Sequence, residues 1–263
     1  MKKICNSMLA GVVLLIAPFS QAAVMQWTFD VSTKWTNAEF TAGNGTATFN
    51  DSLISWGATG GSFTGANPNR SALQLSNSPA TGTINTNGAL AATNTITHFN
   101  NPVALTNRLL DRANLETMLT LTPLLPVAGP QLAPLQTLFS INFVETPNRT
   151  PCNFPSVTIC DDIFILEFGG LNSEFVYEGI SYFISIVELS GNLIPLPNAT
   201  CARAEVANGC LGFTTPERAA TPAQFGFLIT TRTVEVPEPA MLGLFGLGLL
   251  GMRAFGRRRL TKK

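Results

Sequence analysis

The chain has 263 residues, of which only 12% are charged, with 16 basic and 16 acidic side chains. Eight of the basic groups lie at the two ends, so residues 24–236 hold eight basic groups against 15 acidic ones. Nonspecific nucleic-acid binders need basic surfaces that neutralise phosphates, so this acidic interior excludes nucleic acid as a partner. The 22 Gly and 17 Pro residues favour a loop-rich β protein.

The N-terminal segment, residues 1–23, has the organisation of a secretory signal peptide. A pair of lysines precedes an apolar run at residues 8–19, and Ala22 and Ala23 follow it. This order predicts export by a Sec-type machinery and cleavage by signal peptidase after one of these alanines. The alternative is an uncleaved membrane anchor, but the run is shorter than the ~20 residues that a spanning helix needs.

Residues 24–235 are expected to form one exported domain. Apolar and polar residues alternate with the period of two that is typical of strands, and clusters of Gly, Asn and Pro separate these segments. The clearest expected strands are residues 27–31, 46–49, 71–75, 95–99, 118–122, 139–144, 163–168, 182–189 and 225–231. The pattern predicts an all-β, two-sheet antiparallel β-sandwich, either jelly-roll-like or immunoglobulin-like.

Two segments of this domain have other patterns. Residues 105–118 compete as a short helix, since Leu105 and Leu109 share a helical spacing. Residues 123–134 contain four prolines and predict an extended crossover.

The only histidine lies near the end of an expected strand. There, Thr97 and Asn100 could bond to turn backbone, and His98 could hold the same turn through its two ring nitrogens. A ligand-contacting or pH-sensing histidine is the alternative. Catalysis of the Ser-His-Asp type is not predicted, because no Gly-x-Ser-x-Gly elbow is present in the sequence.

Several acidic residues gather near a later strand. Asp161 and Asp162 are adjacent, so we expect their side chains to point to opposite faces, while Glu145 and Glu167 lie on neighbouring segments. One of these carboxylates with loop carbonyls could bind calcium, but no EF-hand spacing supports it and no metal site is assigned. A glycosidase pair cannot be identified from spacing, because such pairs are distant in sequence.

Four aromatic residues raise a choice between the core and a sugar-stacking surface. We expect them to be core residues, as is usual in a sandwich of this size. They are Trp35, Trp56, Tyr177 and Tyr182.

Four cysteines remain once the signal peptide is removed: Cys152, Cys160, Cys201 and Cys210. An even number in an oxidising compartment predicts two disulfides, with three possible pairings. We favour the local pairs, 152 with 160 and 201 with 210, because each encloses a loop containing Pro or Gly. The spacings do not fit a zinc knuckle.

The C-terminal segment, residues 236–263, reads as a sorting signal. It begins with Val236, Pro237, Glu238 and Pro239, continues with an apolar run at 240–252, and carries three consecutive arginines near its end. As a helix the run would extend about 20 Å, against ~30 Å of hydrocarbon, so it predicts a short transmembrane helix that spans only marginally. The arginines would stay on the cytoplasmic side. A plain tail anchor is the alternative.

These C-terminal features resemble the PEP-CTERM sorting signal. The resemblance implies recognition by an exosortase, an integral-membrane enzyme that processes the protein near residues 237–239. It also implies a Gram-negative bacterium that makes exopolysaccharide and biofilm matrix.

A second resemblance covers most of the exported domain. Thr97, His98 and Asn100, followed by Asn101-Pro102, resemble the signature of the THxN family of PEP-CTERM proteins. Residues 142–148, 152–164 and 201–215 are similar to it as well. The resemblance brings no catalytic residue and no cofactor, and it carries over only the three signature positions.

Together these observations predict a non-enzymatic protein of the cell envelope or extracellular matrix. It would be anchored transiently in the inner membrane, processed by exosortase, and then serve a structural or adhesive role among exopolysaccharide. The alternatives are a carbohydrate- or calcium-dependent binding module and, third, a secreted hydrolase.

Overall fold

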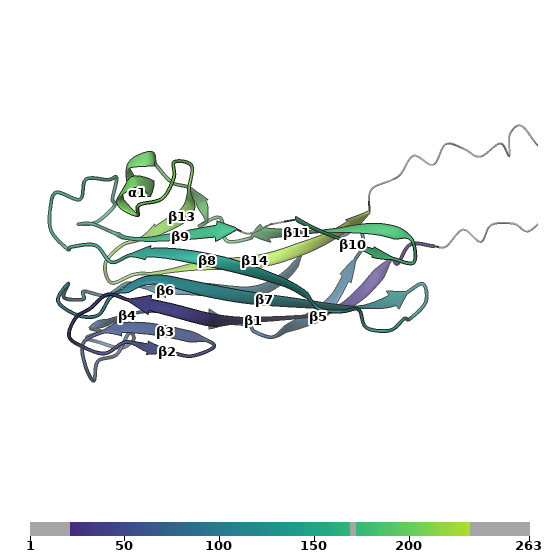
Figure 1. Cartoon of the computed structure of the whole chain (residues 1–263), viewed down its shortest axis with the longest axis horizontal. Coiled ribbons are helices and arrows are strands. Elements are labelled where there is room, and N and C mark those ends of the chain that lie inside the picture. The colour runs from purple at the N-terminus through teal and green to yellow at the C-terminus, as the bar shows by residue number, and fades with distance from the viewer. Residues whose placement is uncertain (1–21, 169–171, 232–263) are drawn as a thin grey trace, which may run out of the picture. The chain divides into compact units, whose positions relative to one another are not determined.

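The computed structural model describes residues 22–168 and 172–231. In this part of the chain, two antiparallel sheets of seven strands each pack face to face (Figure 1). The prediction of an all-β, two-sheet sandwich is confirmed. Residues 1–21 of the expected signal peptide, the sorting motif Val236 to Pro239 and the C-terminal helix lie outside the described residues.

The first sheet contains the two longest strands of the domain, which pair with each other from Gln26 opposite Leu125 to Phe40 opposite Leu110. Its strand order is β12-β13-β9-β8-β7-β1-β5. The strands are β1 (Gln26–Phe40), β5 (Ala80–Asn85), β7 (Leu110–Leu125), β8 (Leu135–Val144), β9 (Asp162–Phe168), β12 (Ile194–Pro195) and β13 (Leu211–Thr215).

The second sheet places the histidine strand, β6, between β4 and β14 in the order β10-β11-β14-β6-β4-β3-β2. The strands are β2 (Thr48–Phe49), β3 (Leu53–Gly57), β4 (Arg70–Ser76), β6 (Ala91–Phe99), β10 (Asn172–Tyr177), β11 (Ile180–Glu188) and β14 (Ala220–Thr231). One short helix, α1 (Asn198–Arg203), follows β12. Among the described residues, no helix has the length and apolar character needed to cross a membrane.

The core lies between the sheets, where alternate residues of each strand point inward. Trp35, Trp56 and Tyr182 are fully buried, as expected of core aromatics. Tyr177 is only partly buried and packs edge-on against Trp27 at 5.7 Å between ring centroids.

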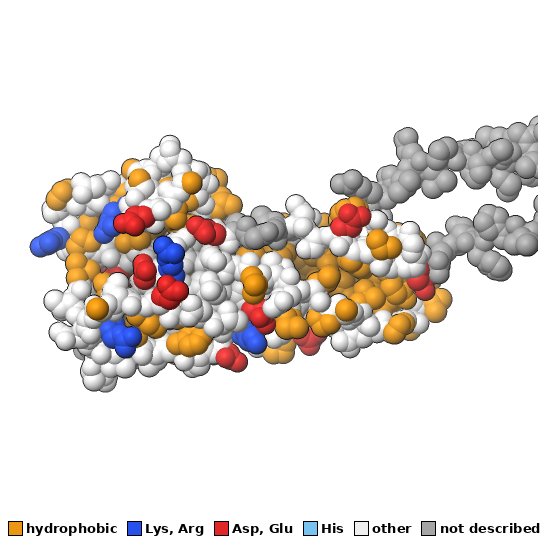
Figure 2. Space-filling view, in the orientation of Figure 1, with side chains coloured by type: hydrophobic (Ala, Val, Ile, Leu, Met, Phe, Trp, Pro, Cys, Tyr) orange, Lys and Arg blue, Asp and Glu red, His pale blue; other side chains and the backbone are white. Residues whose placement is uncertain are grey.

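An apolar hollow also opens between the sheets (Figure 2). Its lining includes Leu135, Phe139, Ile184, Ile186 and Phe227.

Two expectations about the middle of the chain are wrong. Residues 110–118 belong to strand β7 rather than to a helix, because Ala113 and Leu115 fit a period-two pattern of burial and pair with both β1 and β8. Residues 126–134 do not form a crossover. They connect β7 to its antiparallel neighbour β8, with Leu119 opposite Leu135, as a hairpin loop.

Both favoured disulfides are present. Cys152 pairs with Cys160 and Cys201 with Cys210, with Cα–Cα distances of 5.1 and 5.8 Å. Buried Cys201 packs in a small apolar cluster with Phe154, Ile163, Ile165 and Leu196. The bridges therefore flank a satellite core that joins α1 to strand β9.

We expect Cys152→Ser to lower the free energy of unfolding by about 2 to 4 kcal/mol, because the unfolded chain regains the entropy of an open loop. Cys152 is only half-buried, so little packing is lost with the bridge. Urea denaturation of the variant and the wild type measures the difference, which should shrink in reducing buffer. Equal stabilities in oxidising buffer would contradict the role assigned to this bridge.

Candidate functional site

The signature histidine lies inside the sandwich. His98 is in β6, where it pairs across the sheet with Leu73 and Thr221, and its side chain is fully buried. Its ring stacks on Trp56 at 6.1 Å between centroids and meets Phe143 edge-on at 4.9 Å. Strand alternation explains the inward position, because the neighbours Thr97 and Phe99 are both partly exposed.

The ring nitrogens of His98 do not hold a turn, so that expectation is wrong. Neither nitrogen has a hydrogen-bond partner in this structure, and Nε2 lies 3.9 Å from Asp162 Oδ2. Burial lowers the pKa of His98 to about 3, which keeps the ring neutral. The physical reason for the difference is that His98 is still within the strand, and the turn begins after Phe99.

The two asparagines after β6 make the contacts to distant loops. Asn100 Nδ2 donates to the backbone oxygen of Thr215, at the end of β13, over 2.7 Å. Asn101 Nδ2 donates to the backbone oxygens of Arg70 at 2.7 Å and Phe63 at 3.0 Å. The Asn100 contact connects the second sheet to the first, since β6 and β13 belong to different sheets.

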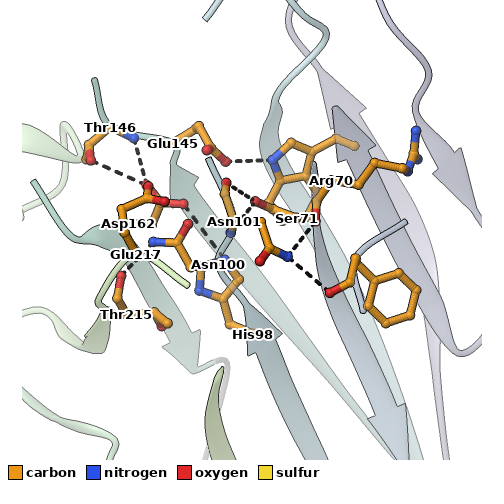
Figure 3. A network of polar contacts seen from close by, with 12 residues as sticks. Arg70, Ser71, His98, Asn100, Asn101, Glu145, Thr146, Asp162, Thr215 and Glu217 are labelled. Carbon is orange, nitrogen blue, oxygen red and sulfur yellow. Dashed lines mark hydrogen bonds and ion pairs between the residues drawn. The ribbon is translucent and has the colours of Figure 1, made fainter. Parts of the chain in front are cut away.

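Two buried carboxyl groups face this region from the first sheet (Figure 3). Glu145 follows β8, and its Oε2 accepts a hydrogen bond from Trp56 Nε1 at 2.7 Å. Asp162 begins β9, and its Oδ1 accepts from the backbone nitrogen of Thr146 at 2.8 Å and from its hydroxyl at 3.3 Å. The other oxygen of each group, Glu145 Oε1 and Asp162 Oδ2, accepts no hydrogen bond from a residue outside this pair, and the two carboxyl groups hydrogen-bond to each other once one of them is protonated.

The electrostatics favour the protonated carboxyl groups. Burial raises the pKa of Glu145 to about 8, despite the opposing hydrogen bond from Trp56. Burial, and then the charge of Glu145, raise the pKa of Asp162 well above its ordinary range. Glu217, in the loop between β13 and β14, adds a third carboxyl whose charge raises both values further. Its own pKa is also raised, mainly by burial.

We call the buried oxygens that lack a hydrogen bond here the acceptor cluster. They come from four residues on the ends of β6, β8, β9 and β13 and from Glu217 in the loop after β13. The atoms are Asn100 Oδ1, Glu145 Oε1, Asp162 Oδ2, Thr215 Oγ1 and both carboxyl oxygens of Glu217. Within the described part of the chain, no group of three or more His, Cys, Asp or Glu side chains is arranged to hold a metal ion.

The other acidic residues singled out in the sequence lie elsewhere. The Asp161 carboxylate accepts hydrogen bonds from the backbone nitrogens of Val157 and Thr158 at 2.8 and 2.9 Å. Burial alone would raise the pKa of Asp161, but these bonds and that of the Thr158 hydroxyl outweigh it and lower the pKa. Glu167 is exposed and accepts from Asn142 at 2.8 Å. Asp161 and Asp162 thus diverge, as expected.

Sequence reasoning missed Thr215 and Glu217 as participants, and it assigned Trp56 to the core without placing it at this site. Trp56 lies in β3 and the other two at or after the end of β13, and only the sheet topology brings them to His98. No local motif marks any of them, because a lone Trp or Glu in a strand or turn has no distinctive spacing.

Comparison with known proteins supports the sorting signal. Residues 235–259 match the model of the PEP-CTERM protein-sorting motif, which includes Val236, Pro237, Glu238 and Pro239. No curated protein sequence matches the chain significantly. The chain thus carries a PEP-CTERM protein-sorting motif, which implies export, processing by exosortase and sorting to the surface or the extracellular space.

The raised pKa of Glu145 predicts a pH-dependent stability in metal-free buffer. An unfolded glutamate ionises near pH 4.5, whereas folded Glu145 keeps its proton up to about pH 8. Its contribution is therefore present below pH 4.5 and is lost as pH rises towards 8. Glu145→Gln should remove a decline of about 1.4 kcal/mol per pH unit across this window.

Urea denaturation at pH 5, 6, 7 and 8 with a chelator measures this slope. Glu167→Gln, which changes an exposed carboxylate, is the matched control and should keep the wild-type slope. Identical slopes in all three proteins would show that Glu145 ionises normally in the fold.

Proposed function

We propose that the protein is a non-enzymatic component of the cell envelope or extracellular matrix, with a structural or adhesive role among exopolysaccharide. The observation that carries this proposal is the sorting motif on a β-sandwich with two disulfides. Disulfides suit an oxidising compartment outside the cytoplasm. The Thr97, His98 and Asn100 signature further supports placing the chain in the THxN subfamily.

The burial of His98 and Asn100 supports a non-enzymatic role. A general base must come within hydrogen-bond reach of the proton that it removes. His98 and Asp162 have no exposed surface, and Trp56 and Phe143 cover the ring of His98. A substrate has no access to these groups in this arrangement. Turnover of matrix glycan by the purified protein would contradict the proposal.

The outer face of the first sheet is suited to adhesion. It carries a grid of polar side chains, most of them threonine hydroxyls, centred on β1. Thr28 of β1 lies between one threonine of β5 and one of β7, and Asp30, two residues further along β1, also lies between a threonine of each strand. The grid consists of Thr28, Asp30, Thr81, Thr83, Thr120 and Thr122. Most of these residues line a shallow hollow of about 460 Å³.

The chemistry of this grid matches that of a polysaccharide. Each threonine hydroxyl both donates and accepts hydrogen bonds, as sugar hydroxyls do. Neighbouring strands repeat at about 4.8 Å, so the grid offers several contacts in one plane. Many weak hydrogen bonds over a polar face suit adhesion to a repeating polymer.

The sorting motif can be tested by localisation. Changing Pro237, Glu238 and Pro239 together to Ala should leave a longer, membrane-retained precursor, because exosortase no longer reads the motif. Immunoblots of membrane and extracellular fractions measure this. Pro130→Ala with Pro134→Ala, in the exposed β7–β8 loop, is the control and should mature normally. Normal maturation of the motif variant would refute the sorting step.

Adhesion can be tested with the exopolysaccharide of the host. The variant Thr28→Val, Thr120→Val and Thr122→Val keeps the β-branched shape and removes three hydroxyls. We expect its binding to be about tenfold weaker or more, from the loss of several hydrogen bonds. Co-sedimentation of the processed protein with the polymer, in chelator, measures it. Thr95→Val, on the outer face of the second sheet, is the control. Unchanged binding by the triple variant would exclude this face.

A further inference from the structure

One end of the sandwich exposes large apolar side chains. Met25 precedes β1, and its backbone nitrogen donates to the backbone oxygen of Leu125, at the end of β7, over 2.8 Å. Val127 follows in the β7–β8 loop, Val176 lies in the last turn-side residues of β10, and Leu90 precedes β6. Val127 is 75% exposed, Val176 64% and Met25 58%, and the two leucines are exposed as well. We call these five residues the apolar tip.

Sheet pairing places the members of the apolar tip at the same end of the domain. The last residue of β7, Leu125, lies opposite the first residue of β1. Trp27 of β1 packs against Tyr177, the neighbour of Val176, at 5.7 Å between ring centroids. Leu90 directly precedes the first residue of β6, which pairs with β14 close to the end of that strand. The tip therefore includes both sheets.

The apolar tip is almost free of charge. The segments that form this end are residues 22–26, 85–91, 123–134, 176–180 and 227–231, and their only charged side chain is Glu178. The loops of the opposite end carry Arg108, Arg149, Arg203 and Arg218. On the face shown in Figure 2, apolar side chains cover much of the half that holds the tip, and most basic ones lie towards the other end. Few charges would thus lose their hydration if the tip entered an apolar environment.

The chain that leaves this end leads to a membrane enzyme. The sorting motif implies processing by exosortase, so the C-terminal segment has to reach the bilayer. Strand β14 ends at the tip with Thr231, and the apolar run of the sorting signal begins at residue 240. The stretch between them extends at most about 32 Å, at ~3.6 Å per residue. The opposite end of the domain is about 50 Å further along β7, at ~3.3 Å per residue.

We propose that the apolar tip docks on the lipid surface of the membrane while the precursor is anchored by its C-terminal segment. The aliphatic side chains enter the boundary between headgroups and acyl chains, as the apolar faces of interfacial proteins do, and Glu178 stays at the water side. The short connection keeps the tip at a high effective concentration near the bilayer, so weak contacts suffice. Docking rests on the anchored precursor of the proposed function and goes beyond the matrix role.

The test uses the precursor after removal of the signal peptide, purified without exosortase and reconstituted into vesicles of phosphatidylethanolamine and phosphatidylglycerol. Val127→Cys in the tip, or Leu105→Cys in the loop at the opposite end, carries one environment-sensitive fluorophore, while the four native cysteines stay paired. We expect the emission at position 127 to shift to the blue and rise severalfold on reconstitution, because the label leaves water. The label at position 105 should keep its spectrum.

A double variant and a control assign the effect to the tip. Leu125→Asp with Val176→Asp, in the Val127→Cys protein, should lose most of the rise in emission, because carboxylates oppose insertion into an apolar boundary. Leu138→Asp changes a side chain that is 57% exposed in β8, away from the tip, and should keep the rise. Far-ultraviolet circular dichroism checks that all three proteins are folded.

The outcomes separate this inference from the anchoring on which it rests. A precursor that sediments with the vesicles while its label at position 127 stays in water would overturn tip docking and leave the anchoring intact. A precursor that does not associate with vesicles would overturn both. A rise that occurs without lipid and grows with protein concentration would mean that a second copy covers the tip. That result, or a rise that the double variant retains, would also overturn the proposal.

Discussion

The two sheets are joined at one end by buried hydrogen bonds as well as by apolar packing. Trp56 of the second sheet donates to Glu145 of the first, and Asn100 after β6 donates to Thr215 at the end of β13. These bonds hold a histidine and two carboxyl groups inside the sandwich, where desolvation lowers the pKa of the base and raises those of the acids. The neutral interior follows from this geometry.

The sequence predicted the class of fold because strand alternation is a local property. It also predicted both disulfides, since each closes a loop of fewer than ten residues. The helix that the spacing of apolar residues suggested at residues 110–118 is absent, because these residues pair with β1 and β8 instead.

The site was predictable only in part. Its signature residues are adjacent in sequence, but Trp56 and Glu217 reach them through sheet topology, which one sequence does not reveal.

Two regions of the domain have different roles in this account. The buried bonds from Trp56 to Glu145 and from Asn100 to Thr215 are closed to solvent and join the two sheets, whereas the hydroxyl grid on β1, β5 and β7 is open. A matrix protein benefits from both features, because it must persist outside the cell and contact a polymer. The sorting motif gives this domain a location, since it implies export and sorting to the surface or the extracellular space, where two disulfides are stable.

The most direct test of the central claim, an exported and exosortase-processed protein, is the intact mass of the mature protein from its native host, measured before and after reduction. The account predicts a chain from about residue 23 to near residue 238, lighter by four hydrogens before reduction, as two disulfides require. A mass that still includes the arginine-rich segment would contradict processing and make the protein a simple membrane-anchored one.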